Sequence, residues 1–254
     1  MKLTRKNFLK LTVGGVVAAC SGGLVGTVRG QNAPPAKEPG TAGVRLGMVV
    51  DLRKCSLEPG CTLCRQACNT AHNVPEIPNP QHAVKWIWNE PTAMVFPAGD
   101  ENLVTQTLTK ELPILCNHCQ HPACVRVCPT QATWKREDGV VMMDYHRCIG
   151  CRYCMAACPY GSRSFNFEDP RPYLPKPTPD FPTRTIGVVE KCNFCEERLA
   201  LGKGPACVAA CPQGALVFGD LNDPGSAVRR LLGSRFALQR RPELGCGPSI
   251  FYLV

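Results

Sequence analysis

The chain has 254 residues, a length that fits one large domain or two small ones. Its 23 glycines and 24 prolines disfavour long uninterrupted helices, and its eighteen cysteines exclude an ordinary enzyme scaffold of this size. The net charge of +9 is uneven: five positive charges lie in residues 1–30, so the remainder carries +4. Four bound iron–sulfur clusters would make that remainder mildly acidic, so nucleic-acid binding loses its main support.

The first thirty residues have the layout of an export signal. Residues 1–10 are basic, and residues 11–28 are apolar, glycine-rich and uncharged. The segment Thr4–Lys10 resembles the twin-arginine export motif, with Lys6 in place of the second arginine. That route carries folded proteins, which suits a chain that takes up its cofactors before export. We therefore predict a twin-arginine-type signal over residues 1–30, a linker over residues 31–42 and a location on the periplasmic side of the cytoplasmic membrane.

Two alternatives for this segment remain open. An uncharged run of about 18 residues can just span a bilayer, so an uncleaved signal would be a membrane anchor. The run Val17-Ala18-Ala19-Cys20 also resembles a lipoprotein cleavage box, which would leave Cys20 lipidated.

Sixteen of the eighteen cysteines fall into four motifs of four, and Cys20 and Cys246 lie outside them. The motifs are Cys55-x5-Cys61-x2-Cys64-x3-Cys68, Cys116-x2-Cys119-x4-Cys124-x3-Cys128, Cys148-x2-Cys151-x2-Cys154-x3-Cys158 and Cys192-x2-Cys195-x11-Cys207-x3-Cys211.

The third motif, which is followed by Pro159, has the spacing of bacterial ferredoxins. Three cysteines in seven residues allow one loop to wrap three corners of a cubane cluster. Tetrahedral zinc has no use for a further cysteine three residues on, and cysteines this close are poor disulfide partners. The sixteen cysteines are therefore predicted to be the iron ligands of four [4Fe-4S] clusters.

Strand-like runs flank the motifs and indicate a duplicated small unit. Each unit is predicted to contain short strands, cluster loops and short helices, which is an α+β fold. The pair Asp138-Gly139 predicts a hairpin with a type I′ turn. The predicted strands are residues 44–50, 140–143 and 185–189 before motifs, and residues 132–135, 164–167 and 215–218 after them.

With these motifs, the sequence resembles the four-cluster ferredoxin subunits of membrane redox complexes, which are the electron-transfer subunits of polysulfide, tetrathionate and dimethyl-sulfoxide reductases. Within that family, His72–Pro75, Val84–Trp88 and Gly219–Pro224 look most like subunit O of the DsrMKJOP complexes (DsrO), which are linked to dissimilatory sulfite reductase. The resemblance implies duplicated ferredoxin-like units, a quinone-interacting polytopic membrane subunit and a multihaem cytochrome c subunit as partners. An electron-transfer subunit of a polysulfide- or tetrathionate-type molybdenum reductase is the alternative.

The resemblance also implies which cysteines share a cluster, because in this family the first motif pairs with the fourth and the second with the third. The implied ligand sets are Cys55, Cys61, Cys64 with Cys211; Cys192, Cys195, Cys207 with Cys68; Cys116, Cys119, Cys124 with Cys158; and Cys148, Cys151, Cys154 with Cys128. The first motif departs from the pattern, since residues 56–60 lengthen its loop and Asn69, not proline, follows Cys68.

The same pairing gives the expected domain organisation. Residues 43–72 and 185–220 are predicted to form the first ferredoxin-like unit and residues 113–168 the second. They are separated by an insertion (73–112) and a proline-rich connection (169–184), and followed by a C-terminal extension (221–254).

Outside the motifs, no residue pattern predicts a substrate site. His118 and His121 are expected to surround the clusters without binding iron, and Trp86 and Trp88 to belong to a core strand, with a contact to a partner as the alternative. The arginines between residues 229 and 241 alternate with apolar residues, as on an amphipathic surface helix. A self-sufficient reductase would need a motif short of a ligand, and none is short.

Overall fold

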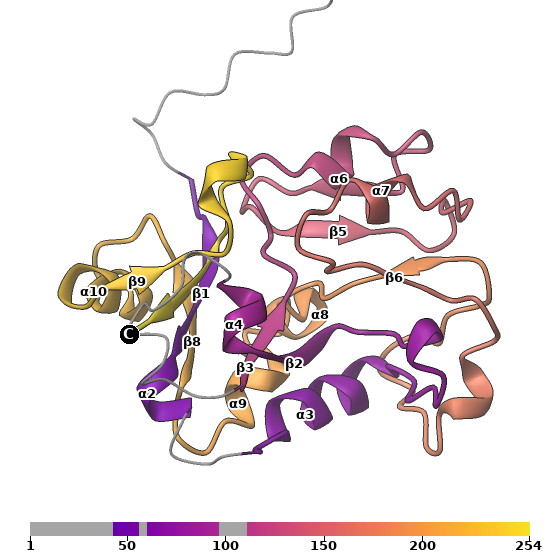
Figure 1. The fold of residues 1–254 in the computed structure, drawn as a ribbon, viewed down its shortest axis with the longest axis horizontal. Coiled ribbons are helices and arrows are strands. Elements are labelled where there is room, and N and C mark those ends of the chain that lie inside the picture. Colours follow the sequence, from indigo (N-terminus) through magenta and orange to yellow (C-terminus); the bar gives the residue numbers. More distant parts are fainter. Residues whose placement is uncertain (1–42, 56–59, 97–110) are drawn as a thin grey trace, which may run out of the picture. The chain divides into compact units, whose positions relative to one another are not determined.

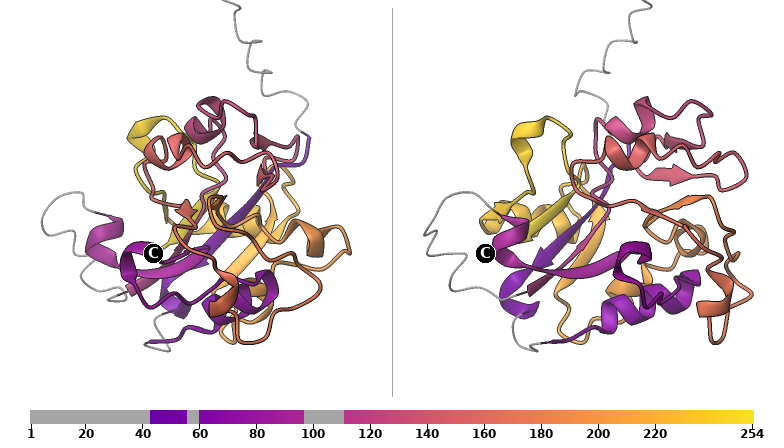
Figure 2. Two further views of the ribbon diagram at one scale, coloured as in Figure 1. Left: turned by 90° about the vertical axis from the view of Figure 1, so that its right-hand side faces the viewer. Right: turned by 45° about the vertical axis from the view of Figure 1, so that its right-hand side comes forward.

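The largest sheet joins the segment before the first cysteine motif to residues near 250. The computed structural model describes residues 43–55, 60–96 and 111–254, which belong to one compact unit. Strands β8 (Leu216–Asp220), β1 (Leu46–Asp51), β10 (Ile250–Leu253) and β9 (Ala237–Leu238) lie in that order. Strand β1 runs antiparallel to β8 and parallel to β10 (Figure 1; Figure 2).

Strand β1 is the centre of this sheet because both of its faces are covered. Met48, Val49 and Val50 are fully buried, as expected for an apolar run with partners on both edges. Gly47 permits the close approach of the next layer. A Cβ atom there would lie 2.5 Å from the side chain of Leu221 and 2.7 Å from the carbonyl oxygen of Ser249.

Three antiparallel strand pairs complete the β-structure of the described residues: β2 (Ile87–Pro91) with β3 (Glu111–Leu115), β4 (Thr133–Lys135) with β5 (Val141–Met143), and β6 (Ser164–Phe165) with β7 (Val189–Glu190). Most of the predicted strands are present with shifted ends. The predicted run 185–189 is a strand only in β7, because Gly187 has a φ of +88° and breaks the extended backbone before it.

The predicted hairpin exists as β4 and β5, but its type I′ turn is wrong. That turn needs positive φ at both central residues, and of Asp138 and Gly139 only Gly139 has it. The connection is longer than two residues: the Gly139 N–H donates to the carbonyl of Arg136, and the Arg136 N–H donates to the carbonyl of Val140. The Asp138 carboxylate accepts from the Val140 N–H at 3.1 Å, which stabilises this wider loop.

The helices of the described residues are short, as the glycine and proline content predicts. They are α2 (Leu52–Cys55), α3 (Leu63–His72), α4 (Thr92–Val95), α6 (Ala123–Arg126), α7 (Tyr153–Ala156), α8 (Glu196–Leu199), α9 (Ala206–Ala209) and α10 (Ala227–Ser234), with 3-10 turns at Pro80–His82, Arg171–Tyr173 and Pro242–Leu244. Helix α3 contacts α9, and α6 contacts α7 (Figure 1). No helix in the described ranges is both long and apolar enough to cross a membrane.

The C-terminal residues are part of the fold and not an appendage to it. Helix α10 is amphipathic, and its fully buried Val228 packs with strand residues Val49 and Leu253. The apolar pattern predicted for this region continues past the helix, but Phe236 is 70% exposed. The reason is that α10 ends at Ser234 and the chain then becomes extended at Arg235. Trp86 and Trp88 are buried in the main core, as the sequence predicts.

Candidate metal centres

Short helices carry one or two cysteines of each motif. Cys64 and Cys68 lie on α3, and Cys207 lies on α9, which contacts α3. Cys124 lies on α6, and Cys154 lies on α7, which contacts α6. Helix packing therefore brings the first motif to the fourth and the second to the third. In each case the residues that follow or precede the helix are tight loops, so further cysteines lie close by.

The first thiol group contains Cys55, Cys61, Cys64 and Cys211. Burial raises the pKa of Cys55 to about 11, and the neighbouring thiols of Cys64, Cys211 and Cys61 act in the same direction. Burial is also the main cause that raises the pKa of Cys64 to about 11, with Cys61 and Cys211 as further contributors. Residues 56–59 of the lengthened loop lie outside the described residues.

The second thiol group contains Cys68, Cys192, Cys195 and Cys207, all of them buried. Burial raises the pKa of Cys68 well above its ordinary value, and the thiols of Cys192, Cys207 and Cys195 act in the same direction. Burial followed by Cys195 raises the pKa of Cys207 to about 12. A cysteine of the first motif is thus surrounded by three cysteines of the fourth.

The third thiol group contains Cys116, Cys119, Cys124 and Cys158. Burial raises the pKa of Cys119, and the thiols of Cys116, Cys124 and Cys158 are among the charges that raise it further. Burial also raises the pKa of Cys158, with Cys116 and Cys124 as the thiols that contribute. Here a cysteine of the third motif lies among three of the second.

The fourth thiol group is less enclosed. Cys128, Cys148 and Cys154 pack in one apolar cluster, together with Cys124 of the third group. Burial raises the pKa of Cys154, and Cys148 is one of the thiols that contribute. Cys151 is exposed, and no other cysteine of the described residues is. The structure therefore brings Cys128 to Cys148 and Cys154 and leaves Cys151 at the surface.

Several thiols accept hydrogen bonds from the backbone. The N–H of Ala215 donates to Cys211 Sγ at 3.2 Å, and the N–H of Ala206 donates to Cys195 Sγ at 3.3 Å. Such bonds favour the thiolate, which is the form that binds a metal. None of the cysteines in the described residues forms a disulfide. Groups of thiols that raise one another's pKa values fit iron, because the positive charge of the metal removes their mutual repulsion.

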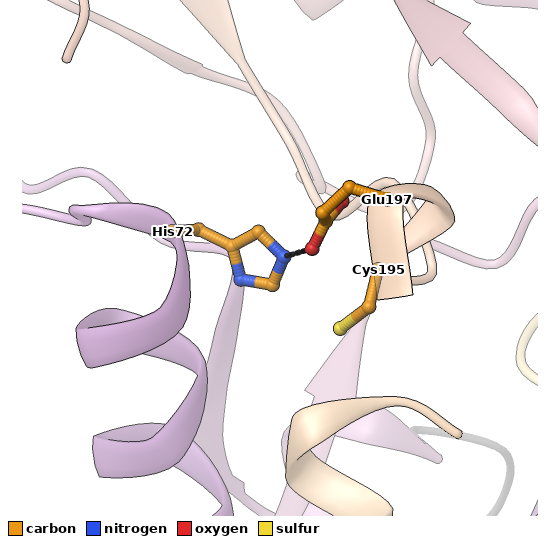
Figure 3. A group of neighbouring side chains, drawn as sticks. All are labelled: His72, Cys195 and Glu197. Carbon is orange, nitrogen blue, oxygen red and sulfur yellow. Dashed lines mark hydrogen bonds and ion pairs between the residues drawn. The ribbon is translucent and has the colours of Figure 1, made fainter. Parts of the chain in front are cut away.

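Histidine and carboxylate side chains adjoin the second thiol group (Figure 3). His72 Nε2 lies 2.9 Å from Glu197 Oε1, and one donor atom each from His72, Cys195 and Glu197 lies within 4.8 Å of the others. His72 Nδ1 lies 3.1 Å from the carbonyl oxygen of Cys68, so both ring nitrogens face acceptors. We interpret His72 and Glu197 as neighbours of the thiol group and not as ligands of a separate ion, since Cys195 belongs to that group.

The sequence did not predict this contact, although one signal was available. Cys68 and His72 are four residues apart, which places them on the same face of α3. No comparable signal pointed to Cys246, which is buried and is one of the groups that raise the pKa of Cys119. His118 is fully buried and stacks on Phe194 with ring centroids 3.6 Å apart. His121 is exposed.

The thiol groups define the class of the molecule: it is an iron–sulfur protein that holds its clusters between pairs of cysteine motifs. Comparison with known proteins specifies the family. The chain matches the 4Fe-4S dicluster domain over residues 108–171 and 174–221.

Relatives in three microorganisms cover most of the chain. It is 42% identical to the "Hdr-like menaquinol oxidoreductase iron-sulfur subunit 1" of Archaeoglobus fulgidus, covering 82% of each protein. It is 40% identical to the tetrathionate reductase electron-transfer relative TtrB-type chain of Salmonella typhimurium, covering 86% of this chain and 76% of the relative. It is 38% identical to the "Menaquinone reductase, iron-sulfur cluster-binding subunit" of Nitratidesulfovibrio vulgaris, covering 83% and 89%.

The chain belongs to this family of iron–sulfur subunits, which confirms the resemblance to the four-cluster subunits of membrane redox complexes. It is an electron-transfer protein with a duplicated dicluster arrangement and four [4Fe-4S] clusters.

Proposed function

We propose that the chain is the electron-transfer subunit of a membrane-bound, quinone-interacting redox complex of sulfur metabolism, comparable to subunit O of the DsrMKJOP complexes. The names of two relatives, a menaquinol oxidoreductase subunit and a menaquinone reductase subunit, support the link to a quinone. In this role the chain relays electrons between a polytopic membrane subunit and a multihaem cytochrome c subunit and has no substrate site of its own.

The observation that carries the proposal is the grouping of thiols across motifs. Cys68 adjoins three cysteines of the fourth motif, and Cys158 adjoins two of the second. When bound, each cluster supplies one-electron chemistry, and the residues of the chain fix its position and adjust its potential. Ligands that cross between motifs hold the two clusters of a pair close together, which is what relay over several steps requires.

We propose the ligand sets implied by the family, and these can be tested by comparing serine variants. Cys158→Ser and Cys124→Ser should alter the same paramagnetic resonance signal of the reduced, anaerobically purified protein, because both would remove a ligand of one cluster. Cys154→Ser should alter a different signal. Cys246→Ser, which removes a buried thiol outside the four motifs, is the control and should retain all signals. If Cys158→Ser and Cys154→Ser alter the same signal, each motif binds its own cluster and the crossed assignment is wrong.

The composition of the purified complex distinguishes the two candidate functions. A DsrMKJOP-like complex should contain covalently bound haem c and no molybdenum. A complex with a molybdenum subunit and no multihaem cytochrome would support the alternative, an electron-transfer subunit of a tetrathionate- or polysulfide-type reductase, which the names of two relatives favour. About sixteen iron atoms per chain are expected in either case, whereas about eight would contradict both.

We also propose export by the twin-arginine route to the periplasmic side of the membrane. The segment that carries the signal lies outside the described residues, so the support is the pattern of residues 1–30. Replacement of Arg5 by lysine removes the single arginine of the pair and should leave cluster-loaded protein in the cytoplasm. Fractionation that finds the Arg5→Lys variant exported normally would contradict this route. Detection of a lipid on Cys20 would instead support the lipoprotein alternative.

A further inference from the structure

Arg163 is a buried cation without a carboxylate partner. It is 4% exposed, and none of the ion pairs among the described residues includes it. Arg184, which is 2% exposed, is the contrasting case, because its guanidinium lies 2.7 Å from the carboxylate of Glu190. A buried charge is costly unless an opposite charge compensates it, so the surroundings of Arg163 need an explanation.

Sulfur atoms take the place of the missing carboxylate. Arg163 Nη2 donates to Cys124 Sγ at 3.0 Å and to the hydroxyl of Thr133 at 2.8 Å, while Nη1 lies 3.7 Å from Met143 Sδ. Burial lowers the pKa of Arg163, but the thiols of Cys124, Cys154 and Cys116 outweigh it and leave the pKa raised. The guanidinium is therefore held by a hydroxyl on one side and by cysteines on the other.

These cysteines belong to both thiol groups of the second and third motifs. Cys124 and Cys116 are members of the third group, and Cys154 is a member of the fourth. The direct hydrogen bond goes to Cys124 alone. Arg163 consequently lies beside both groups but bonds to one of them, so its effect on the two should be unequal.

We propose that Arg163 is a positioning residue that compensates the charge of the cluster held by the third thiol group and raises its reduction potential above that of its neighbour. Reduction adds one electron, supplied by the donor of the relay, to a cluster whose thiolates are already negative. A fixed positive charge and a hydrogen bond to a ligand sulfur stabilise the reduced form more than the oxidised form. The inference rests on the proposed ligand sets and goes beyond them by ordering two potentials.

The test is a redox titration of the anaerobically purified full chain, with the clusters followed by paramagnetic resonance. Arg163→Met removes the charge and the hydrogen bond while filling much of the same volume. The equilibrium constant for reduction of one cluster should fall at least tenfold, which for one electron is 59 mV, and the signal concerned should be the one altered by Cys124→Ser. Arg163→Lys keeps the charge and should show a smaller shift. Arg171→Met removes an exposed arginine paired with Asp169 and is the matched control, with no shift expected.

Unchanged potentials in Arg163→Met at full iron content would overturn the inference. If that variant loses iron, Arg163→Gln, which keeps a donor without the charge, decides: a lowered constant supports the inference and an unchanged one overturns it. Iron loss in both variants also counts against it, because a purely structural arginine gives that result. The proposed function fails separately, if the wild-type chain lacks four reducible clusters or enters no quinone-reactive complex.

Discussion

The buried pair of Arg184 and Glu190 gives a stability prediction that follows directly from its surroundings. Both side chains are at most 1% exposed and lie 2.7 Å apart. Glu190 also accepts from Trp86 Nε1 at 3.0 Å and from Asn166 Nδ2 at 2.5 Å. Replacement of Glu190 by glutamine keeps the shape but removes the negative charge that faces the guanidinium. Loss of one partner of a buried pair costs about 3–5 kcal/mol, because the other charge is left uncompensated.

Hydrogen exchange of the β6–β7 region measures this cost locally. The Gly187 N–H donates to the carbonyl of Asn166, and the Asn166 N–H donates to that of Val188, so both amides report opening beside Glu190. Their opening free energy should fall by about 3–5 kcal/mol in Glu190→Gln, which corresponds to exchange at least about a hundredfold faster. The double variant Arg184→Met/Glu190→Gln should be less destabilised than the sum of its single variants, since it leaves no buried charge.

The control for this prediction is Glu168→Gln. That carboxylate also accepts two hydrogen bonds, from His82 and Tyr173, but it is partly exposed, so water can replace them. The amides of the β6–β7 pair should exchange as in the wild type. Unchanged exchange in Glu190→Gln, or strictly additive effects in the double variant, would refute the argument that the buried charges depend on each other.

Three further predictions concern α3, one cluster loop and α10. Burial lowers the pKa of His72, but hydrogen bonds with Cys195 and Glu197 outweigh it and raise the pKa to about 9; the stabilisation by protonated His72 should be complete below its ordinary value of 6.5 and lost as pH rises through 9. Exchange of the α3 amides should show that slope in the wild type and not in His72→Gln. Gly150→Ala should release iron faster on dilution into chelator, because its Cβ would lie 2.3 Å from the carbonyl oxygen of Gly187 and its φ of +68° disfavours alanine; iron retention equal to wild type would contradict this. Ser226→Ala should cost about 1 kcal/mol in the opening of α10 amides, since the hydroxyl caps the helix, and an unchanged opening free energy would show that the cap is dispensable.

The sequence was sufficient for the composition of the sites and insufficient for their surroundings. Four motifs with ferredoxin spacing predicted the clusters, because ligation to a cubane constrains spacing along the chain. The runs before Cys55 and after Cys211 were recognisable as strands for the same local reason. Their pairing as β1 and β8 could not be read from either run alone, since it depends on residues more than 150 positions apart.

Other features had no local signature at all. A single arginine five residues after Cys158 gives no hint that it will be buried against Cys124. Cys246 was set aside because it belongs to no motif, yet tertiary folding places it near Cys119. The turn at Asp138 was misjudged because the dipeptide Asp-Gly indicates a hairpin more strongly than it indicates the length of the loop. Residues 253 and 216 meet the same sheet through contacts that only the complete fold provides.

The position of β10 between β1 and β9 also constrains how the molecule is made. Strand β1 leads directly into α2 and Cys55, but its second partner is not synthesised until about 200 residues later. During translation, the first thiol group likewise waits for Cys211. Folding on the ribosome therefore cannot close the central sheet or complete that group early, and nascent chains expose reduced cysteines for most of their synthesis. Biogenesis of this subunit should accordingly depend on chaperones or cluster-delivery factors that act after residue 253 has left the ribosome.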